Sequence, residues 1–427
     1  MLTRAFVHAR LCGLRARLGR LARIDHASVG IRPQDEPYAP SAEHFAAANR
    51  RLAAIEHSAA QRYHQLRATC YQAPIQQVLV DIALVERELD RARRAFGLFF
   101  EVLGQRGTTF APALAAHDAI AEDCYAAVRK AAPRIFAGPL LKPICYMEHG
   151  YSPATMRRGV TLSRLLGEPN PFPLIRIPWD REHPWDAVFL HEVAHNLQAD
   201  LGIWQENHQA VVRRLADRLR DPMQAMVYGR WHKEIFADLA AILLGGPAAA
   251  WGMAMFLAHP APRTMTYRPG SAHPTAYLRV LILVQMLIRM GFSGHAERLR
   301  RLWTTLYDPR RLTRIPPRLL AGAERAIPEV VDEIAYQTRR NLAHRALVDI
   351  LPFGEADERR IVAAARRLAT GRAQVGDLPP RLLVSAASYA LVQEGVAPPE
   401  LSRTVTTLLN EHRNQRISVT NDARTAA

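Results

Sequence analysis

A chain of 427 residues, 49% of them apolar, has the composition of an ordinary globular protein and is long enough for two or three units with buried cores. Its formal net charge of +16 comes almost wholly from arginine, which we attribute to compositional bias. Because no recognised nucleic-acid motif accompanies this charge, we expect no specific nucleic-acid partner. The four cysteines are scattered, with no Cys-x-x-Cys pair, and fit free thiols in the cytoplasm.

Residues 1–40 are predicted to form a basic N-terminal arm and a linker. Residues 1–24 contain six arginines and no acidic residue, and their leucines recur at helical spacing. This pattern is typical of an organelle-targeting segment or of a helix that contacts an acidic membrane from its surface. An arginine-coated helix packed on the protein body explains it equally well. Three prolines in residues 30–40 then interrupt any periodic pattern.

Residues 41–132 are predicted to form a helical region. Residues 46–57 and 78–103 carry apolar residues at helical spacing, and residues 104–112 provide a break between helices. No residue in this region carries a chemical signature, so we expect it to be a scaffold.

Residues 133–292 are predicted to form a core that contains a small sheet. Between Pro133 and Trp179 the sequence changes to prolines, glycines and short apolar runs. One run alternates apolar and polar residues around Arg176, which predicts a half-buried strand.

A predicted helix from Pro184 to Gly202 carries the strongest chemical signal of the chain. Pro184 suits a first-turn position, and Gly202 lies where a helix usually ends. At 3.6 residues per turn, His191 and His195 lie one turn apart on one face, so both imidazoles can reach one metal ion. Glu192 lies between them.

A second apolar segment, residues 230–247, carries two carboxylates one helical turn apart. Glu234 and Asp238 would be costly to bury there without a partner or a metal ion. The following stretch from Leu239 to Ala258 is uncharged over about the length that crosses a bilayer. Because Gly245, Gly246 and Pro247 interrupt it, we expect two buried helices and a turn rather than a transmembrane span.

The HEVAH sequence at residues 191–195, followed after a spacer by EIFAD at residues 234–238, resembles the gluzincin type of zinc metallopeptidase. The resemblance covers at most about a quarter of the chain, and neither flank resembles a known family. It implies one Zn²⁺ per chain, held by His191, His195 and Glu234, with Asp238 as partner of a ligand histidine. It also implies that Glu192 is the general base, acting on a water whose pKa zinc lowers to about 7. By the same analogy, residues 174–177 or residues 156–160 would form a sheet edge that pairs with an extended peptide.

The residues around these motifs also limit the other ligand sets and the choice of oxyanion donor. A metzincin would need glycine at Gln198 and histidine at Leu201, so that class is excluded. His208 remains the alternative third ligand. Zinc peptidases also need a donor for the developing oxyanion. The candidates for this donor are His273, Tyr228, Tyr277 and Arg279. We prefer His273 and Tyr228 as the catalytic residues.

Residues 293–413 are predicted to form a C-terminal helical bundle. Proline pairs at 316–317, 379–380 and 398–399 are expected to separate its helices. Residues 414–427 are polar, and we expect them to form a disordered tail.

The sequence as a whole predicts a mostly helical α+β protein with a zincin-like core, flanked by helical regions. The expected activity is zinc-dependent hydrolysis of peptide or protein substrates. The alternative is a non-catalytic helical interaction or regulatory protein that retains a structural metal site. Structural zinc normally has four protein ligands, often cysteines, and no cysteine lies near this motif.

Overall fold

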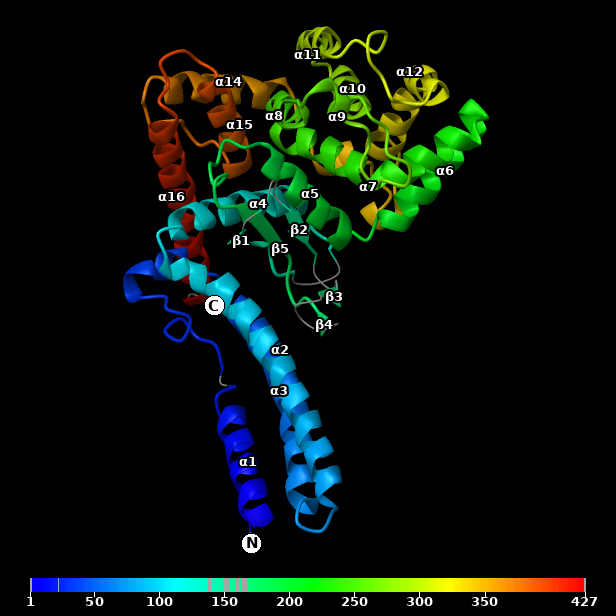
Figure 1. The fold of residues 1–427 in the computed structure, drawn as a ribbon. Helices are drawn as coiled ribbons and strands as arrows, with labels where there is room; N and C mark the ends of the chain where they lie inside the picture. Colours follow the sequence, from blue (N-terminus) through cyan, green and yellow to red (C-terminus); the bar gives the residue numbers. More distant parts are fainter. Residues whose placement is uncertain are drawn as a thin grey trace. The chain divides into compact units, whose positions relative to one another are not determined.

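The structure is a computed structural model of the chain, and it describes residues 2–21, 23–136, 140–148, 150, 154–157, 161–162 and 168–425. It is mostly helical with a small sheet, which confirms the predicted mostly helical α+β class, while the zincin-like core stays a prediction (Figure 1). The longer helices are α1 (Leu2–Leu18), α2 (Ala42–Thr69), α3 (Ile75–Gly104), α4 (Ala111–Ala131), α5 (Val188–Asp200), α6 (Trp204–Leu219), α7 (Pro222–Gly245), α8 (Pro247–Leu257), α10 (Ala276–Arg289), α11 (Ser293–Leu306), α12 (Pro317–Val331), α14 (Glu355–Ala369), α15 (Pro380–Leu391) and α16 (Pro398–Thr425).

Short helical segments and strands connect these helices. The short helical segments are η1 (Pro33–Tyr38), η2 (Gln105–Gly107), α9 (Ala261–Thr264), η4 (Asp332–Tyr336), η5 (Arg340–Leu342) and α13 (Leu347–Ile350). The strands are β1 (Ile144–Glu148), β2 (Ala154–Met156), β3 (Thr161–Leu162), β4 (Glu168–Pro169) and β5 (Leu174–Pro178).

The chain divides into two compact units. Unit 1 comprises Met1–Leu114, Ile144–Met147 and Met156–Leu174, and unit 2 comprises Ala115–Pro143, Glu148–Thr155 and Ile175–Ala427. The finer boundaries that the sequence suggested, after residues 40, 132, 292 and 413, stay predictions.

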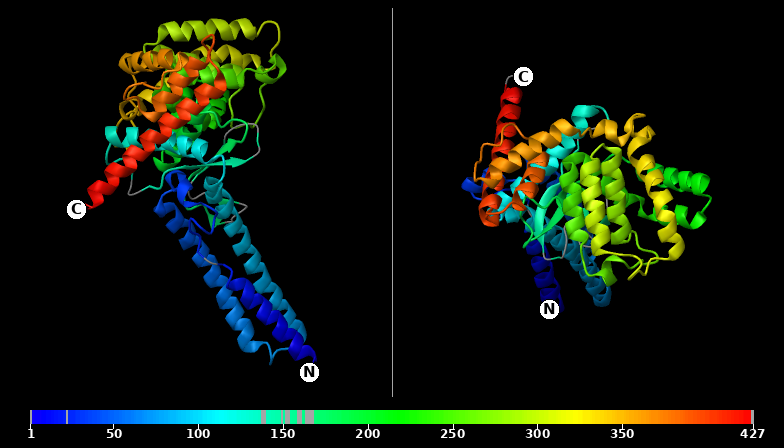
Figure 2. Two further views of the ribbon diagram at one scale, coloured as in Figure 1. Left: turned by 90° about the vertical axis from the view of Figure 1, so that its left-hand side faces the viewer. Right: turned by 90° about the horizontal axis from the view of Figure 1, so that it is seen from above.

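Unit 1 contains the long helical hairpin of α2 and α3, with α1 packed along it (Figure 2). Apolar side chains at helical spacing on the three helices form one core, which explains why these polar-rich helices associate. Its members are Val7, Leu11, Leu14, Tyr63, Leu66, Cys70, Val78, Ile82, Val85 and Leu89.

The three-stranded sheet has the order β1-β5-β2, and β3 pairs antiparallel with β4. β5 confirms the strand expected around Arg176, but it is the middle strand, and Leu174, Ile175 and Ile177 are all buried. The expectation of a half-buried strand is therefore wrong, because side chains on both of its faces are buried, and so is the expectation of a free edge, because a middle strand pairs on both sides. Of the other proposed edge, Met156 lies in the edge strand β2, whereas residues 158–160 lie outside the described residues.

The uncharged stretch after Asp238 forms the buried end of α7 and the whole of α8, as expected. The two helices meet at Gly246, whose φ is 70° and where a Cβ would lie 2.1 Å from the ring of Phe353. Only glycine fits this corner, since both the backbone angle and the available space exclude a side chain. Within the described residues, no helix has the length and apolar character needed to cross a membrane.

The C-terminal proline pairs lie where helices begin, as the sequence predicts. Pro317, Pro380 and Pro398 are the first residues of α12, α15 and α16. However, α16 continues to Thr425, so helix covers most of the segment that we expected to be disordered.

Candidate metal centre

Helix α5 places three functional side chains in the interior of unit 2. It begins at Val188, whose N–H donates to Oδ1 of Asp186 at 3.1 Å, and it ends just before Gly202, which has a φ of 65°. The sequence places the start of this helix at Pro184, a few residues before the observed start at Val188. Because α5 is apolar on most faces and almost wholly buried, His191 and Glu192 are held where water is scarce.

Helix α7 brings the two carboxylates to α5. Pro222 is its first residue, and the side chain of Asp221 accepts from the N–H groups of Met223 and Gln224, so the helix start is fixed by both proline and cap. The two helices pack extensively against one another. Since Glu234 and Asp238 are one turn apart, both point at the same side of α5.

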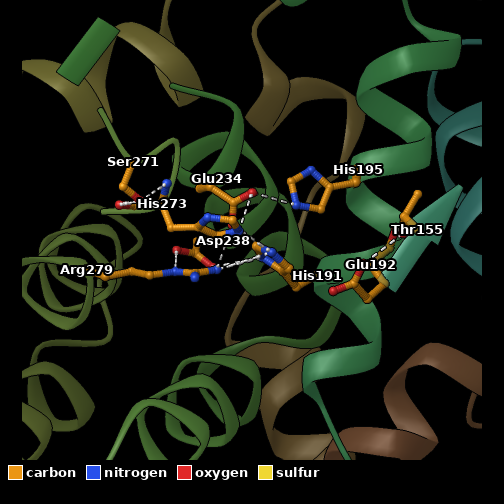
Figure 3. A network of polar contacts seen from close by, with 9 residues as sticks. All are labelled: Thr155, His191, Glu192, His195, Glu234, Asp238, Ser271, His273 and Arg279. Carbon is orange, nitrogen blue, oxygen red and sulfur yellow. Dashed lines mark hydrogen bonds and ion pairs between the residues drawn. The ribbon is translucent and has the colours of Figure 1, made fainter. Parts of the chain in front are cut away.

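Three side chains converge on a common point, as Figure 3 shows. Oε2 of Glu234 lies 3.5 Å from Nε2 of His191, and its Oε1 lies 3.3 Å from Nε2 of His195. One ligand atom from each residue falls within 4.8 Å of the others, so the group could hold one metal ion. His195 is the most open of the three, with 16% of its side chain exposed, which leaves access for solvent or another ligand.

The alternative ligand, His208, is not part of this group. Its ring lies 5.2 Å from that of His232, in a T-shaped arrangement. Burial lowers the pKa of His232 to about 4, so this second histidine is neutral at neutral pH.

A buried ion-pair network supports the ligands from behind. Nε and Nη2 of Arg279, on α10, donate to the two oxygens of Asp238 at 2.6 and 2.8 Å. Oδ1 of Asp238 in turn lies 2.9 Å from Nδ1 of His191. The Nδ1–H of His191 can therefore donate to Asp238, which leaves Nε2 facing Oε2 of Glu234, with Nη2 of Arg279 also 3.1 Å away.

The same network shifts the pKa values of its members. Burial raises the pKa of Asp238, but the charges of Arg279 and His191 lower it by more, so the carboxyl stays ionised. Burial and Arg279 lower the pKa of His191, yet the two carboxylates outweigh them and raise it to about 9. A metal ion that binds His191 near neutral pH must then displace a proton.

Arg279→Leu is expected to destabilise the protein by about 3 kcal/mol, because it leaves Asp238 and Glu234 buried with one cation fewer. The free energy of unfolding should be measured by urea titration with a chelator present, so that metal occupancy does not contribute. Arg359→Leu serves as control, since Arg359 forms an exposed pair with Glu355 that contributes little. Equal stability of the Arg279→Leu variant and the parent would show that the buried network is not stabilising.

Glu192 is held beside the metal-binding group by a residue that the sequence analysis missed. Oγ1 of Thr155, in the edge strand β2, lies 2.8 Å from Oε2 of Glu192 and 2.9 Å from its main-chain oxygen. The hydroxyl can donate to the carboxylate and so fixes its rotamer. No local pattern could have revealed this contact, because 37 residues separate the two positions.

The four candidate oxyanion donors differ in their exposure and in their contacts with the metal-binding group. Nε2 of His273 lies 3.6 Å from Oε1 of Glu234, and its side chain is 68% exposed, so it lies at the open side of the group. Arg279 donates to Asp238, and its Nη2 also lies 3.1 Å from Nε2 of His191 and 3.5 Å from Oε2 of Glu234. Tyr228 and Tyr277 are buried, burial raises the pKa of both phenols, and neither belongs to the network in Figure 3.

Comparison of the chain with protein-family models, with curated proteins and with solved structures found no match.

Proposed function

We propose that the chain is a zinc-dependent metallopeptidase of the gluzincin type. The observation that carries this proposal is the convergence of His191, His195 and Glu234 beside the carboxylate of Glu192. Two imidazoles and one carboxylate are ligands that zinc prefers, and three protein ligands are typical of catalytic rather than structural zinc.

The spacing of the ligand atoms also supports zinc. Bonds of about 2.0–2.1 Å in tetrahedral geometry separate neighbouring ligand atoms by about 3.3–3.4 Å. Oε2 of Glu234 lies 3.5 Å from Nε2 of His191 and its Oε1 lies 3.3 Å from Nε2 of His195, so each oxygen is near that separation from one histidine. Asp238 would hold His191 in the tautomer that presents Nε2, the usual arrangement for a metal-bound histidine.

Zinc, when bound, supplies a Lewis acid and lowers the pKa of its water to about 7. The remaining chemistry falls to side chains of the chain itself. Glu192 would accept a proton from the attacking water and later return it to the leaving amine. Thr155 would keep that carboxylate in place, and His273 would donate a hydrogen bond to the carbonyl oxygen of the substrate as charge develops on it.

The proposed substrate is an extended peptide or protein segment. β2 is an edge strand, and its Thr155 touches Glu192, so a peptide paired with this edge would lie beside the proposed base. Main-chain pairing of this kind favours extended segments without a strong preference for their side chains. The free state of all four cysteines supports a cytoplasmic location as part of the proposal.

Digestion of a peptide library by the zinc-loaded protein tests this function. We expect new amino termini, detected by mass spectrometry, that do not form when a chelator is added. A protein that holds zinc but produces no new termini would favour the non-catalytic alternative, a metal site that serves structure or regulation.

A further inference from the structure

Helix α1 has a second apolar face besides the one that packs into unit 1. Val7, Leu11 and Leu14 are buried and belong to the core shared with α2 and α3. The residues on the opposite side of the helix are all exposed, and none of them is polar or charged apart from one thiol. They are Leu2, Ala5, Phe6, Ala9, Cys12, Gly13 and Ala16.

The seven positions form a helical stripe, because at 100° per residue they all fall within an arc of about 120° on one side of the helix. Its two large residues are strongly exposed, Leu2 at 88% and Phe6 at 52%. Moving side chains of this size out of water lowers the free energy. The face is therefore suited to contact with an apolar surface.

Arginines border the stripe on both sides. At 100° per residue, Arg4 and Arg15 fall on one flank, and Arg10 and Arg17 on the other. Nη2 of Arg10 and Nη2 of Arg17 each lie 2.9 Å from Oε1 of Glu86 on α3, which ties one flank to the hairpin. Residues 1–24 contain no carboxylate side chain, so the face as a whole is cationic.

The end of the helical hairpin continues this surface. Figures 1 and 2 show the start of α1 at the end of unit 1 where α2 turns into α3. There Tyr71 is 51% exposed and Ile75 is 38% exposed. Residues 67–80 contain one arginine, Arg67, and no acidic residue. The tip thus adds exposed apolar side chains, with no acidic residue among positions 67–80, near the start of α1.

We propose that the outer face of α1, with the adjoining hairpin tip, docks onto an anionic lipid bilayer surface. The apolar stripe would enter the boundary between head groups and acyl chains, while Arg4 and Arg15 on the other flank contact lipid phosphates. This proposal does not depend on the metal centre, so it stands or falls separately from the proposed function.

Charge selects this occupant over two others. A second copy of the chain would bring the arginine-bordered faces of two α1 helices together, and like charges would oppose that contact. A nucleic acid would satisfy the arginines, but its phosphate backbone offers nothing to Leu2 and Phe6. An anionic bilayer satisfies both parts of the surface.

Co-sedimentation of the full chain with lipid vesicles tests the proposal. We expect binding to vesicles of phosphatidylcholine mixed with phosphatidylglycerol, much weaker binding to phosphatidylcholine alone, and weakening of the former by salt. The double substitution Leu2→Ser and Phe6→Ser should reduce the partition coefficient at least about tenfold. Arg4→Gln and Arg15→Gln should each reduce it about fivefold.

A matched control lies on α11, where Leu302 and Leu306 are also four residues apart and are 44% and 52% exposed beside arginines. Leu302→Ser with Leu306→Ser should leave vesicle binding unchanged. Circular dichroism and metal content should match the parent in all variants, because every substituted side chain is exposed. Full binding by the Leu2→Ser and Phe6→Ser variant, or no binding by the parent, would overturn the proposal. A lipid-free dimer that this variant abolishes would overturn it in favour of a second copy.

Discussion

Glu234→Ala is expected to lower the zinc content of the purified protein from about one ion per chain to almost none. The substitution removes one of three ligands and leaves His191 and His195 alone on α5. Loss of a partner outside the ligand set typically costs 10–100-fold in metal affinity, so loss of a ligand should cost more than about 100-fold. Metal analysis by mass spectrometry after dialysis against buffered zinc measures the effect. His191→Ala and His195→Ala should behave in the same way.

Glu358→Ala provides the control for this measurement. Glu358 and Glu234 are both 8% exposed, but Glu358 lies on α14, where it accepts from the hydroxyl of Tyr389. The variant should keep its zinc, because no ligand changes. Normal zinc content in Glu234→Ala would reject the ligand assignment and return attention to His208, although the structure pairs that residue with His232.

Glu192→Gln is expected to lower the rate of peptide hydrolysis by about 10²–10⁴-fold while the zinc content stays unchanged. Glutamine has the shape of glutamate and can still accept a hydrogen bond from Thr155, so the local packing is preserved. What is lost is the ability to take a proton. The measurement is kcat/KM on a peptide identified from the library digest, beside metal analysis of the same preparation.

Glu358→Gln is the matched control, since it too removes a buried carboxylate, and it should cleave at the parent rate. If Glu192→Gln cleaved as fast as the parent, Glu192 would not be the general base. If it lost zinc as well as activity, the loss of rate would report metal binding and would leave the base unidentified.

The local half of the metal centre could be predicted from sequence, because helical spacing alone relates His191 to His195. Glu234 could be singled out as a carboxylate in an apolar segment, but only a resemblance joined it to the two histidines, since no periodicity relates residues 39 positions apart. Arg279 shows the limit of such reasoning. Its charge suggested an oxyanion donor, whereas the structure commits it to Asp238, 41 residues away. Which helices pack together decides that role, and helical spacing does not contain this information.

The fold shows the same division between local and long-range information. Alternation around Arg176 was sufficient to predict a strand, but its place in the middle of the sheet depends on pairing with strands elsewhere in the chain. At the other end of the chain, polar composition suggested disorder after residue 413. The buried Leu401, Val405 and Leu409 anchor α16, and a helix once started extends at little cost into such residues.

The two compact units are interleaved along the chain, which crosses from one to the other after residues 114, 143, 147, 155 and 174. A fragment that begins at Ile175 would contain all three candidate ligands. It would lack α4, whose Tyr125 donates to Asp200 at 2.7 Å and whose His117 ring lies 4.8 Å from that of Phe189. It would also lack Thr155. A fragment that begins at Ile175 would therefore lose these contacts, because unit 2 is assembled from three separate stretches of the chain.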